Sequence, residues 1–593
     1  MIRYSLFSLC LCVASQICAA PIPGDVDRSP VDLVLSQDNA WLVTANQSSD
    51  SVSLVSTSDG VVLDEVAVGR HPAALALAPN GKQVLVTGSY SGDMTVLEVR
   101  DRRLELIAAI HVGYEPTGVA VSPDGKEAYV ACSANAEVAV IDLTSNEVVA
   151  RIEVGRWPRY MALSPDGTRL AVGTSGDRGV SVVDTKKRKM LYLEKFVGLN
   201  IGHMQTSRNG RHVYFPWVTY RRNPLNARNI RLGWVLATRI ARVKLDGKAR
   251  REAVSLDPQG KAIADPHGLA LTSDEKRLVV SASGTHELLL YRATDLPLQD
   301  YGGTDHVPSS LLRDKDRFDR IDVGGRPMGL RIAKDDKTVF VANYLDNSVQ
   351  VVDIETRQLV RAIPLGGASE PSLARLGEAI FFDGRRSLDQ WYSCHSCHYD
   401  GGSNSVTMDT LNDDTNQTYK TVLPLFNVNK TSPWTWHGWQ TDLHAAMRKS
   451  ITSTMIGEEP NDEDVDALVA YLKALQPPPN PFRQKDGSLT EAAIRGKAVF
   501  ESDRANCASC HNGPLFTDGQ IHDVGVGRDS DKYKGFNTPS LVGLYRKIAF
   551  LHDGRAKSLG DLLTDLHSPK KVSGSEQLRD DEVQDLIAYL KSL

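Results

Sequence analysis

The chain of 593 residues has no dominant charge, few cysteines and, after its first twenty residues, no long apolar run. Its net charge of −5 is small for this length and offers no basic stripe, so the sequence gives no support for nucleic-acid binding. No later stretch approaches the ~20 uninterrupted apolar residues of a membrane-spanning helix, so we expect a soluble mature protein. With 41% hydrophobic residues, the chain can bury more than one core.

Residues 1–20 are predicted to be a cleavable secretory signal. Arg3 gives a positive start, an apolar run follows from Leu6 to Val13, and Cys18-Ala19-Ala20 supplies small residues at the end. We therefore expect a periplasmic or secreted protein. Three of the eight cysteines belong to this segment, which leaves five in the mature chain.

Four of these five cysteines form two C-x-x-C-H motifs, Cys394-His395-Ser396-Cys397-His398 and Cys507-Ala508-Ser509-Cys510-His511. This spacing is the attachment signal for c-type haem, because the two thiols bind the vinyl groups and the histidine supplies an axial nitrogen to iron. Zinc is the competing interpretation, but the pairs lie more than a hundred residues apart and each is followed directly by histidine. We expect two covalently bound haem c groups and no disulfides, with Cys132 as a small core residue.

The first 365 residues contain a repeat. The pattern V-G-x-x-P occurs at Val68–Pro72, Val112–Pro116, Val154–Pro158 and Val323–Pro327, and the first three copies are about 42 to 44 residues apart. That period is typical of a propeller blade, and alternating apolar residues between Gly, Asp and Asn turns favour short antiparallel strands. Seven units fit between residues 30 and 366, with insertions in blades five and six. The repeat resembles the YVTN-type seven-bladed propellers, a resemblance that indicates fold more than function.

One insertion, Phe215–Asn223, departs from the repeat and mixes aromatic with cationic residues. It is predicted to pack on the second half of the chain or on a partner protein; a loop that covers its own blade is the alternative. His203, His267 and His286 are interpreted as loop or strand residues rather than metal ligands.

The second half of the chain also repeats itself. The segment Leu376–Phe381 before the first C-x-x-C-H motif pairs with Arg495–Phe500 before the second, and each half ends in an amphipathic helix. We predict two helical cytochrome c modules, residues 371–476 and 483–593, joined by a stiff proline-rich connector. The predicted fold class is multidomain: an all-β seven-bladed propeller at 30–366, followed by a mainly α tandem cytochrome c domain.

Residues 371–593 resemble the bacterial dihaem cytochrome c peroxidase family, including its branch that matures methylamine dehydrogenase. The resemblance rests on the two haem motifs, on Asn512–Phe516, on Thr538–Leu541 and on His552–Arg555. It implies that Trp436 lies between the two haems and helps to move electrons. At the positions of the family's glutamine and glutamate, which manage protons, this chain has Ala446 and Ile456, with Glu458 and Glu459 nearby as substitutes.

The resemblance also bears on the axial ligands. The family ligates the second haem with methionine or tyrosine, but Ser558–Pro569 contains neither, so we predict that His567 ligates that iron opposite His511. A surface histidine is the alternative. No histidine lies between His398 and Trp436, so the first haem should have an open sixth site unless His437 or His444 reaches it. His395 is expected to be solvated.

The family's calcium site between the halves is only partly matched, because its asparagine position is Thr421.

The leading functional hypothesis is an exported dihaem oxidoreductase of the cytochrome c peroxidase type. Electrons would come from a redox partner, such as a small cytochrome, a cupredoxin or a protein substrate, and would meet an oxidant such as peroxide at the first haem under His398. The propeller would dock the partner. The alternatives are a non-catalytic electron-transfer cytochrome and binding module, and a propeller scaffold with degenerate haem domains.

Overall fold

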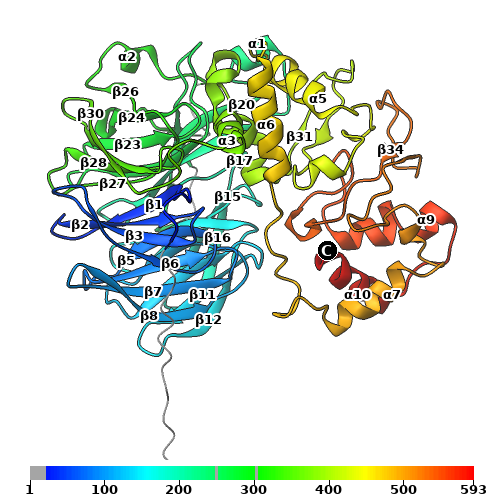
Figure 1. The fold of residues 1–593 in the computed structure, drawn as a ribbon, viewed down its shortest axis with the longest axis horizontal. Helices are drawn as coiled ribbons and strands as arrows, with labels where there is room; N and C mark the ends of the chain where they lie inside the picture. The colour runs from blue at the N-terminus through cyan, green and yellow to red at the C-terminus, as the bar shows by residue number, and fades with distance from the viewer. Residues whose placement is uncertain (1–21, 248–250, 301–304) are drawn as a thin grey trace, which may run out of the picture.

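The computed structural model describes residues 22–247, 251–300 and 305–593, so the predicted signal peptide lies outside the described residues. Figure 1 shows a strand-rich part, coloured blue to green, beside a helical part coloured yellow to red. Among the described residues, no helix is both long and apolar enough to span a membrane.

The strand-rich part is a seven-bladed β-propeller, as predicted. Six blades have four antiparallel strands each and blade five has six. The strands of blades one to four are β1 Pro30–Leu35, β2 Trp41–Asn46, β3 Ser51–Ser56, β4 Val62–Ala67, β5 Pro72–Leu77, β6 Gln83–Gly88, β7 Asp93–Arg100, β8 Arg103–His111, β9 Pro116–Val121, β10 Glu127–Cys132, β11 Glu137–Asp142, β12 Glu147–Glu153, β13 Pro158–Leu163, β14 Arg169–Thr174, β15 Gly179–Asp184 and β16 Lys189–Lys195.

Blades five and six carry the predicted insertions. In blade five, the two nine-residue strands β19 and β20 are joined through helix α1. The remaining propeller elements are β17 Gly198–Leu199, β18 Gln205–Thr206, β19 His212–Tyr220, α1 Ala227–Arg231, β20 Leu236–Lys244, β21 Glu252–Ser255, β22 Pro266–Leu271, β23 Arg277–Ala282, β24 Glu287–Arg292, β25 Gln299–Asp300, α2 Ser309–Leu312, β26 Phe318–Asp322, β27 Pro327–Ile332, β28 Thr338–Asn343, β29 Ser348–Asp353 and β30 Gln358–Pro364.

Side-chain hydrogen bonds help to close the propeller ring where its first and last blades meet. The side-chain oxygen of Asn347 accepts from the backbone N–H groups of Arg28 and Ser29, each at 2.9 Å, and its amide nitrogen donates to Asp27 at 2.7 Å. These bonds tie the chain before β1 to the loop between β28 and β29. Blade one is complete without a strand from the end of the propeller, because β1 to β4 form one sheet.

The helical part is built from two copies of one helix crossing. In the first module α3 (Leu373–Phe382) crosses α6 (Asp462–Ala474), and in the second α7 (Glu491–Phe500) crosses α10 (Asp580–Lys591). A Cβ atom on Gly377 would lie 1.8 Å from the carbonyl oxygen of Ala467, and one on Gly496 would lie 1.9 Å from that of Asp585. Only glycine therefore permits each crossing.

Short elements complete both modules and hold the residues of the candidate site. They are α4 Cys394–Cys397, β31 Thr407–Met408, β32 Lys420–Thr421, α5 Leu443–Lys449, the π-helical turn η6 Ser450–Thr454, β33 Ile521–His522, β34 Phe536–Asn537, α8 Leu559–Asp561, the π-helical turn η9 Leu562–Leu566 and α9 Pro569–Ser573.

The first module shares a hydrophobic core with the insertion of blade five. Val218, Tyr220 and Ile230 of the propeller pack in one buried cluster with the first module. The hydroxyl of Tyr220 donates to the carbonyl of Thr407, and the indole nitrogen of Trp391 donates to the carbonyl of Leu236. The prediction that the insertion packs on the haem region is confirmed.

Candidate haem sites

A cavity of about 390 Å³ in the first module is lined by Cys394, Cys397 and His398. The ring of His398 is oriented by its Nδ1 atom, which lies 2.9 Å from the carbonyl oxygen of Leu423. A histidine that donates Nδ1–H to a carbonyl presents its Nε2 lone pair to a metal, which is how ligating histidines are generally held.

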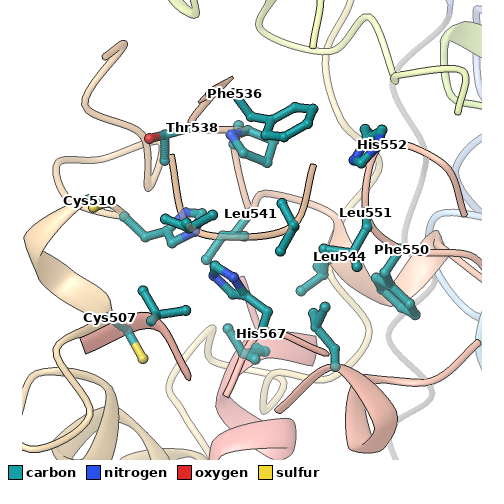
Figure 2. Close-up of a pocket in the computed structure, with 18 of the residues that line it drawn as sticks. Cys507, Cys510, Phe536, Thr538, Leu541, Leu544, Phe550, Leu551, His552 and His567 are labelled. Carbon is teal, nitrogen blue, oxygen red and sulfur yellow. The ribbon is translucent and has the colours of Figure 1, made fainter. Parts of the chain in front are cut away.

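A second cavity, of about 180 Å³, has the same arrangement in the second module (Figure 2). Cys507, Cys510 and His511 line it, and Nδ1 of His511 lies 3.1 Å from the carbonyl oxygen of Phe516. The two predicted proximal histidines are therefore held in the same way, each with Nε2 left for the cavity.

The donor set fits covalent haem. All four thiols are unpaired and partly buried, and burial raises the pKa of Cys394 and Cys397 to about 12. The zinc interpretation does not fit, because the two cysteine pairs line different cavities. Within the part of the chain that the structure describes, one group of three possible metal ligands is found, Cys510 with Asp518 and His522, and it contains only one cysteine of a pair.

His567 lies at the second cavity, as predicted, directly after the π-helical turn η9. Figure 2 shows its ring among the apolar residues that line this cavity. Its Nδ1 atom is buried without a hydrogen-bond partner among the described residues. Burial and then the nearby His511 lower the pKa of His567 to about 4, so the ring is neutral and its nitrogen lone pair is free at neutral pH.

The first module places Met455 at the matching position, directly after the π-helical turn η6. Met455 is 4% exposed and lines the first cavity, with its Sδ atom 3.8 Å from Sγ of Cys394. If a haem is attached at Cys394, Met455 would lie beside that thioether bond. Sequence reasoning missed Met455, although aligning the two halves through to their π-helical turns would have found it.

The two other histidines considered as ligands of the first iron differ in whether they reach the first cavity. His444 is half-exposed, pairs with Asp466 at 3.2 Å and does not line the cavity. His437 lines the cavity, but its Nδ1 atom lies 2.9 Å from the carbonyl oxygen of Gly535 and its ring packs against Phe536.

Residues at the positions of the family's acid–base pair cannot move protons. Ala446 lines the first cavity, and Ile456 packs beside it in the core of the first module. Glu458 and Glu459 are exposed and line no part of this cavity, and Glu459 pairs with Arg448 at 3.1 Å. The prediction that Glu458 or Glu459 takes the place of the missing carboxylate is therefore wrong.

Asp409 is a carboxylate in the first cavity that sequence reasoning missed. It is 1% exposed, and burial raises its pKa although it accepts hydrogen bonds from the backbone of Leu411 at 3.1 Å and Gln417 at 2.7 Å. A buried carboxyl group with a raised pKa in a pocket can hold and release a proton. No motif in the sequence marks this residue, because only the fold brings it to the cavity.

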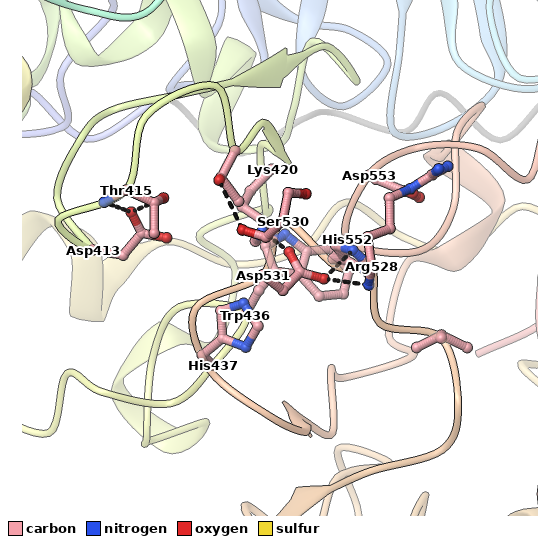
Figure 3. A network of polar contacts seen from close by, with 12 residues as sticks. Asp413, Thr415, Lys420, Trp436, His437, Arg528, Ser530, Asp531, His552 and Asp553 are labelled. Carbon is pink, nitrogen blue, oxygen red and sulfur yellow. Dashed lines mark hydrogen bonds and ion pairs between the residues drawn. The ribbon is translucent and has the colours of Figure 1, made fainter.

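Trp436 borders both cavities. Its indole nitrogen donates to the carbonyl of Thr421 at 2.8 Å, and its ring meets that of His552 edge-on at 6.3 Å between centroids. A polar network fixes this region by joining the modules (Figure 3): Asp531 forms an ion pair with Lys420, 2.5 Å from its Nζ, and lies 3.1 Å from Nε2 of His552.

The calcium site stays a prediction. The hydroxyl of Thr421 donates to the carbonyls of Leu551 and His552, at 2.5 and 2.8 Å.

The expectation that His395 is solvated is wrong. It is 5% exposed, and its ring packs against Phe382 and Tyr399. Both of these rings belong to the first module. The propeller holds the motif beside it: Asp265 accepts hydrogen bonds from the hydroxyls of Ser393 and Ser396, at 2.5 and 2.6 Å.

The three propeller histidines have ring or ion-pair partners. The rings of His203 and His267 pack together with that of Tyr160 in the channel of the propeller. His286 is buried and lies 3.2 Å from Asp383 of the first module.

Comparisons with known proteins agree with this geometry. Residues 371–488 match the family described as di-haem cytochrome c peroxidase, and residues 493–593 match cytochrome c. Hydrazine synthase subunit gamma of Kuenenia stuttgartiensis is 30% identical over 275 residues, which are 37% of this chain and 77% of that protein. Methylamine utilization protein MauG of Methylorubrum extorquens is 26% identical over 39% of this chain and 80% of its own length. Cytochrome-c peroxidase IdrP2 of Denitromonas iodatirespirans is 23% identical, over 40% and 84%.

Proposed function

Because this chain belongs to the dihaem cytochrome c peroxidase family, we propose that it takes electrons from a partner protein at its second module and delivers them to a peroxide in the cavity of its first module. The chain is a dihaem c-type oxidoreductase with two covalently bound haem c groups. Those groups supply redox-active iron.

In this proposal the cysteine pairs Cys394/Cys397 and Cys507/Cys510 hold the two haems. His398 and His511 supply the proximal nitrogens, each oriented by a backbone carbonyl. His567, which lines the second cavity, would supply the second nitrogen there, and an oxidant would then find no free position on that iron.

The observation that carries the proposal is the difference between the residues that follow the two π-helical turns. An imidazole follows η9, whereas a thioether 3.8 Å from Sγ of Cys394 follows η6. The first cavity is also the larger one, at about 390 Å³ against about 180 Å³. A small oxidant therefore has a place in the first module, and the second module is suited to electron transfer.

Reduction of a peroxide ROOH to ROH and water consumes two electrons and two protons. Trp436 borders both cavities and is the proposed relay for the electrons. Asp409 is the proposed proton donor, since it is the buried carboxylate with a raised pKa in the first cavity. Asp409 would thus donate the proton that the glutamate donates in the family, where this chain has Ile456.

The partner is proposed to be a small cytochrome, a cupredoxin or a protein substrate, and the propeller is proposed to dock it. The surface of the propeller away from the helical part is left free for such contacts (Figure 1). We also propose that the protein acts after export, in the periplasm or outside the cell. The two c-type haem motifs and the predicted secretory signal at residues 1–20 support this proposal.

The test is electron paramagnetic resonance of the oxidised holoprotein with and without hydrogen peroxide, followed by stopped-flow oxidation of the reduced holoprotein. We expect one high-spin signal that changes on adding peroxide beside one low-spin signal that does not, and reoxidation by peroxide that outpaces free haem. Two unresponsive low-spin signals, with reoxidation no faster than free haem, would favour the electron-carrier alternative and sink the proposal.

A further inference from the structure

A small chamber lies between the propeller and both haem modules, apart from the two haem cavities. Its volume is about 100 Å³, enough for several water molecules. The propeller contributes His71, Glu115 and Arg326 from the mouth of its central channel, and the modules cover that mouth with Tyr399 and Arg546.

The repeat V-G-x-x-P sets the propeller side of this chamber. His71, Glu115 and Arg326 each stand directly before the proline that opens an inner strand, in three different blades. The backbone of His71 and Glu115 is left-handed there, with φ of 56° and 49°. One position of the repeat therefore gives each blade a side chain of its own at the channel mouth.

Two of the guanidinium groups around the chamber have carboxylate partners. Arg159 lies 3.4 Å from Asp400, and Arg546 lies 3.5 Å from Glu115, which also accepts from the hydroxyl of Tyr545 at 2.9 Å. These pairs balance each other's charge across the boundary between propeller and haem modules.

Arg326 is the third guanidinium, and it differs from the other two. It is 5% exposed and lies 3.4 Å from the ring centroid of Phe382 and 4.8 Å from that of Tyr344. Within residues 22–247, 251–300 and 305–593, its guanidinium group makes no hydrogen bond to a side chain or carbonyl and no ion pair. The chamber thus contains one buried positive charge in excess of its carboxylates.

We propose that this chamber binds a small oxyanion, inorganic or a short carboxylate, through Arg326 with Arg159 and Arg546 beside it. A buried charge is costly unless it is paired, and an anion with two or more oxygens matches the planar fork of a guanidinium group. Because the three arginines come from blade four, blade seven and the second module, the bound anion bridges propeller and haem domain. The chamber is separate from the site of the proposed reaction, because none of the residues that line it lines either haem cavity.

The experiment is isothermal titration calorimetry of the holoprotein with sulfate, phosphate and acetate at constant ionic strength. Arg326→Gln removes the unpaired charge, and Arg156→Gln is the matched control. Arg156 lies on the same propeller face, pairs with Asp177 at 2.9 Å and does not line the chamber. We expect Arg326→Gln to weaken binding by about tenfold or more, a loss of about 1.4 kcal/mol, and Arg156→Gln to leave it unchanged.

Tighter binding of sulfate or phosphate would identify the ligand as an inorganic oxyanion, and tighter binding of acetate would identify it as a carboxylate. If none of the three binds the wild type, or if both variants weaken binding equally, the proposal is wrong. Should Arg326→Gln fail to fold, as judged by circular dichroism, Arg546→Gln carries the test with the same two outcomes. A bound anion also raises the melting temperature of the wild type by mass action, and that shift must shrink in the variant.

Discussion

The two haem modules share one backbone plan and differ in the side chain that this plan presents to the haem cavity. Both have a helix crossing that only glycine permits, a proximal histidine held by a backbone carbonyl, and a π-helical turn. The turn ends on Met455 in the first module and on His567 in the second. The comparison teaches that a duplicated frame can be given two different tasks by changing single residues.

The modules also differ in their attachment to the propeller. The core of the first continues into blade five, whereas the second has a hydrophobic core of its own. The second module reaches the propeller through contacts such as those of Tyr545 and Arg546 with Glu115. The proposed reaction site is thus the one that the propeller braces directly.

Removing the imidazole of the second module should have the largest effect. His567→Ala is expected to abolish the low-spin resonance, because the second iron loses its sixth ligand. The measurement is electron paramagnetic resonance of the oxidised holoprotein. His444→Ala, a change at an exposed histidine outside both cavities, is the control. A low-spin signal that survives in His567→Ala would show that another residue is the ligand.

Placing a histidine at position 455, as the second module has at 567, should occupy the sixth coordination position of the first iron. Met455→His is expected to convert the high-spin signal to low spin and to reduce the reaction with peroxide to background, because the iron gains a nitrogen ligand. Met455→Leu keeps the apolar contact and should leave both readouts unchanged. If Met455→Leu itself alters the spin state, the sulfur is already an iron ligand and the open-site interpretation fails.

The helix crossings provide a test in which the modules should respond alike. Gly377→Ala and Gly496→Ala each place a methyl group less than 2 Å from a carbonyl oxygen of the facing helix. Each is expected to destabilise its module by about 3 kcal/mol, measured by denaturant unfolding. Gly560→Ala, where a Cβ would meet only the Ser558 hydroxyl at 3.5 Å, is the control. Wild-type stability in either crossing variant would refute the close approach.

The proton for peroxide reduction is expected to come from a residue of the first module, Asp409. Asp409→Asn is expected to lower kcat/KM for peroxide by about a hundredfold, as is typical for loss of a general acid. The electron paramagnetic resonance spectra of both haems should stay unchanged, since no ligand is altered. An unchanged rate would assign Asp409 to loop structure only, through its bonds to Leu411 and Gln417.

The smallest effect is expected at the boundary between the modules. Trp436→Phe keeps an aromatic ring beside both cavities but loses the indole hydrogen bond to Thr421. We expect electron transfer between the haems to slow by about tenfold, or about 1.4 kcal/mol of barrier, in stopped-flow spectra. Trp439→Phe, which changes a tryptophan that borders only the first cavity, is the control. Equal rates in the two variants would remove Trp436 from the relay.

Local patterns predicted the fold because they repeat. The V-G-x-x-P copies predicted the blades, and the paired segments around Gly377 and Gly496 predicted two like modules. His567 could be singled out because its segment contains no methionine or tyrosine. Aligning the two halves would also have singled out Met455, which stands at the position of His567. Asp409 could not be singled out, because its place in the cavity depends on contacts between distant parts of the chain. The burial of His395 was missed because the variable position inside a haem motif gives no sign of the rings of Phe382 and Tyr399 that pack on it.

The hold of Asp265 on Ser393 and Ser396 has a consequence for how the protein is made. Both serines flank or separate the thiols of the first motif, and Trp391 just before them is locked into blade five. These contacts hold the backbone and side chains next to both thiols. We therefore expect the thioether bonds at Cys394 and Cys397 to form before this segment is packed against the propeller.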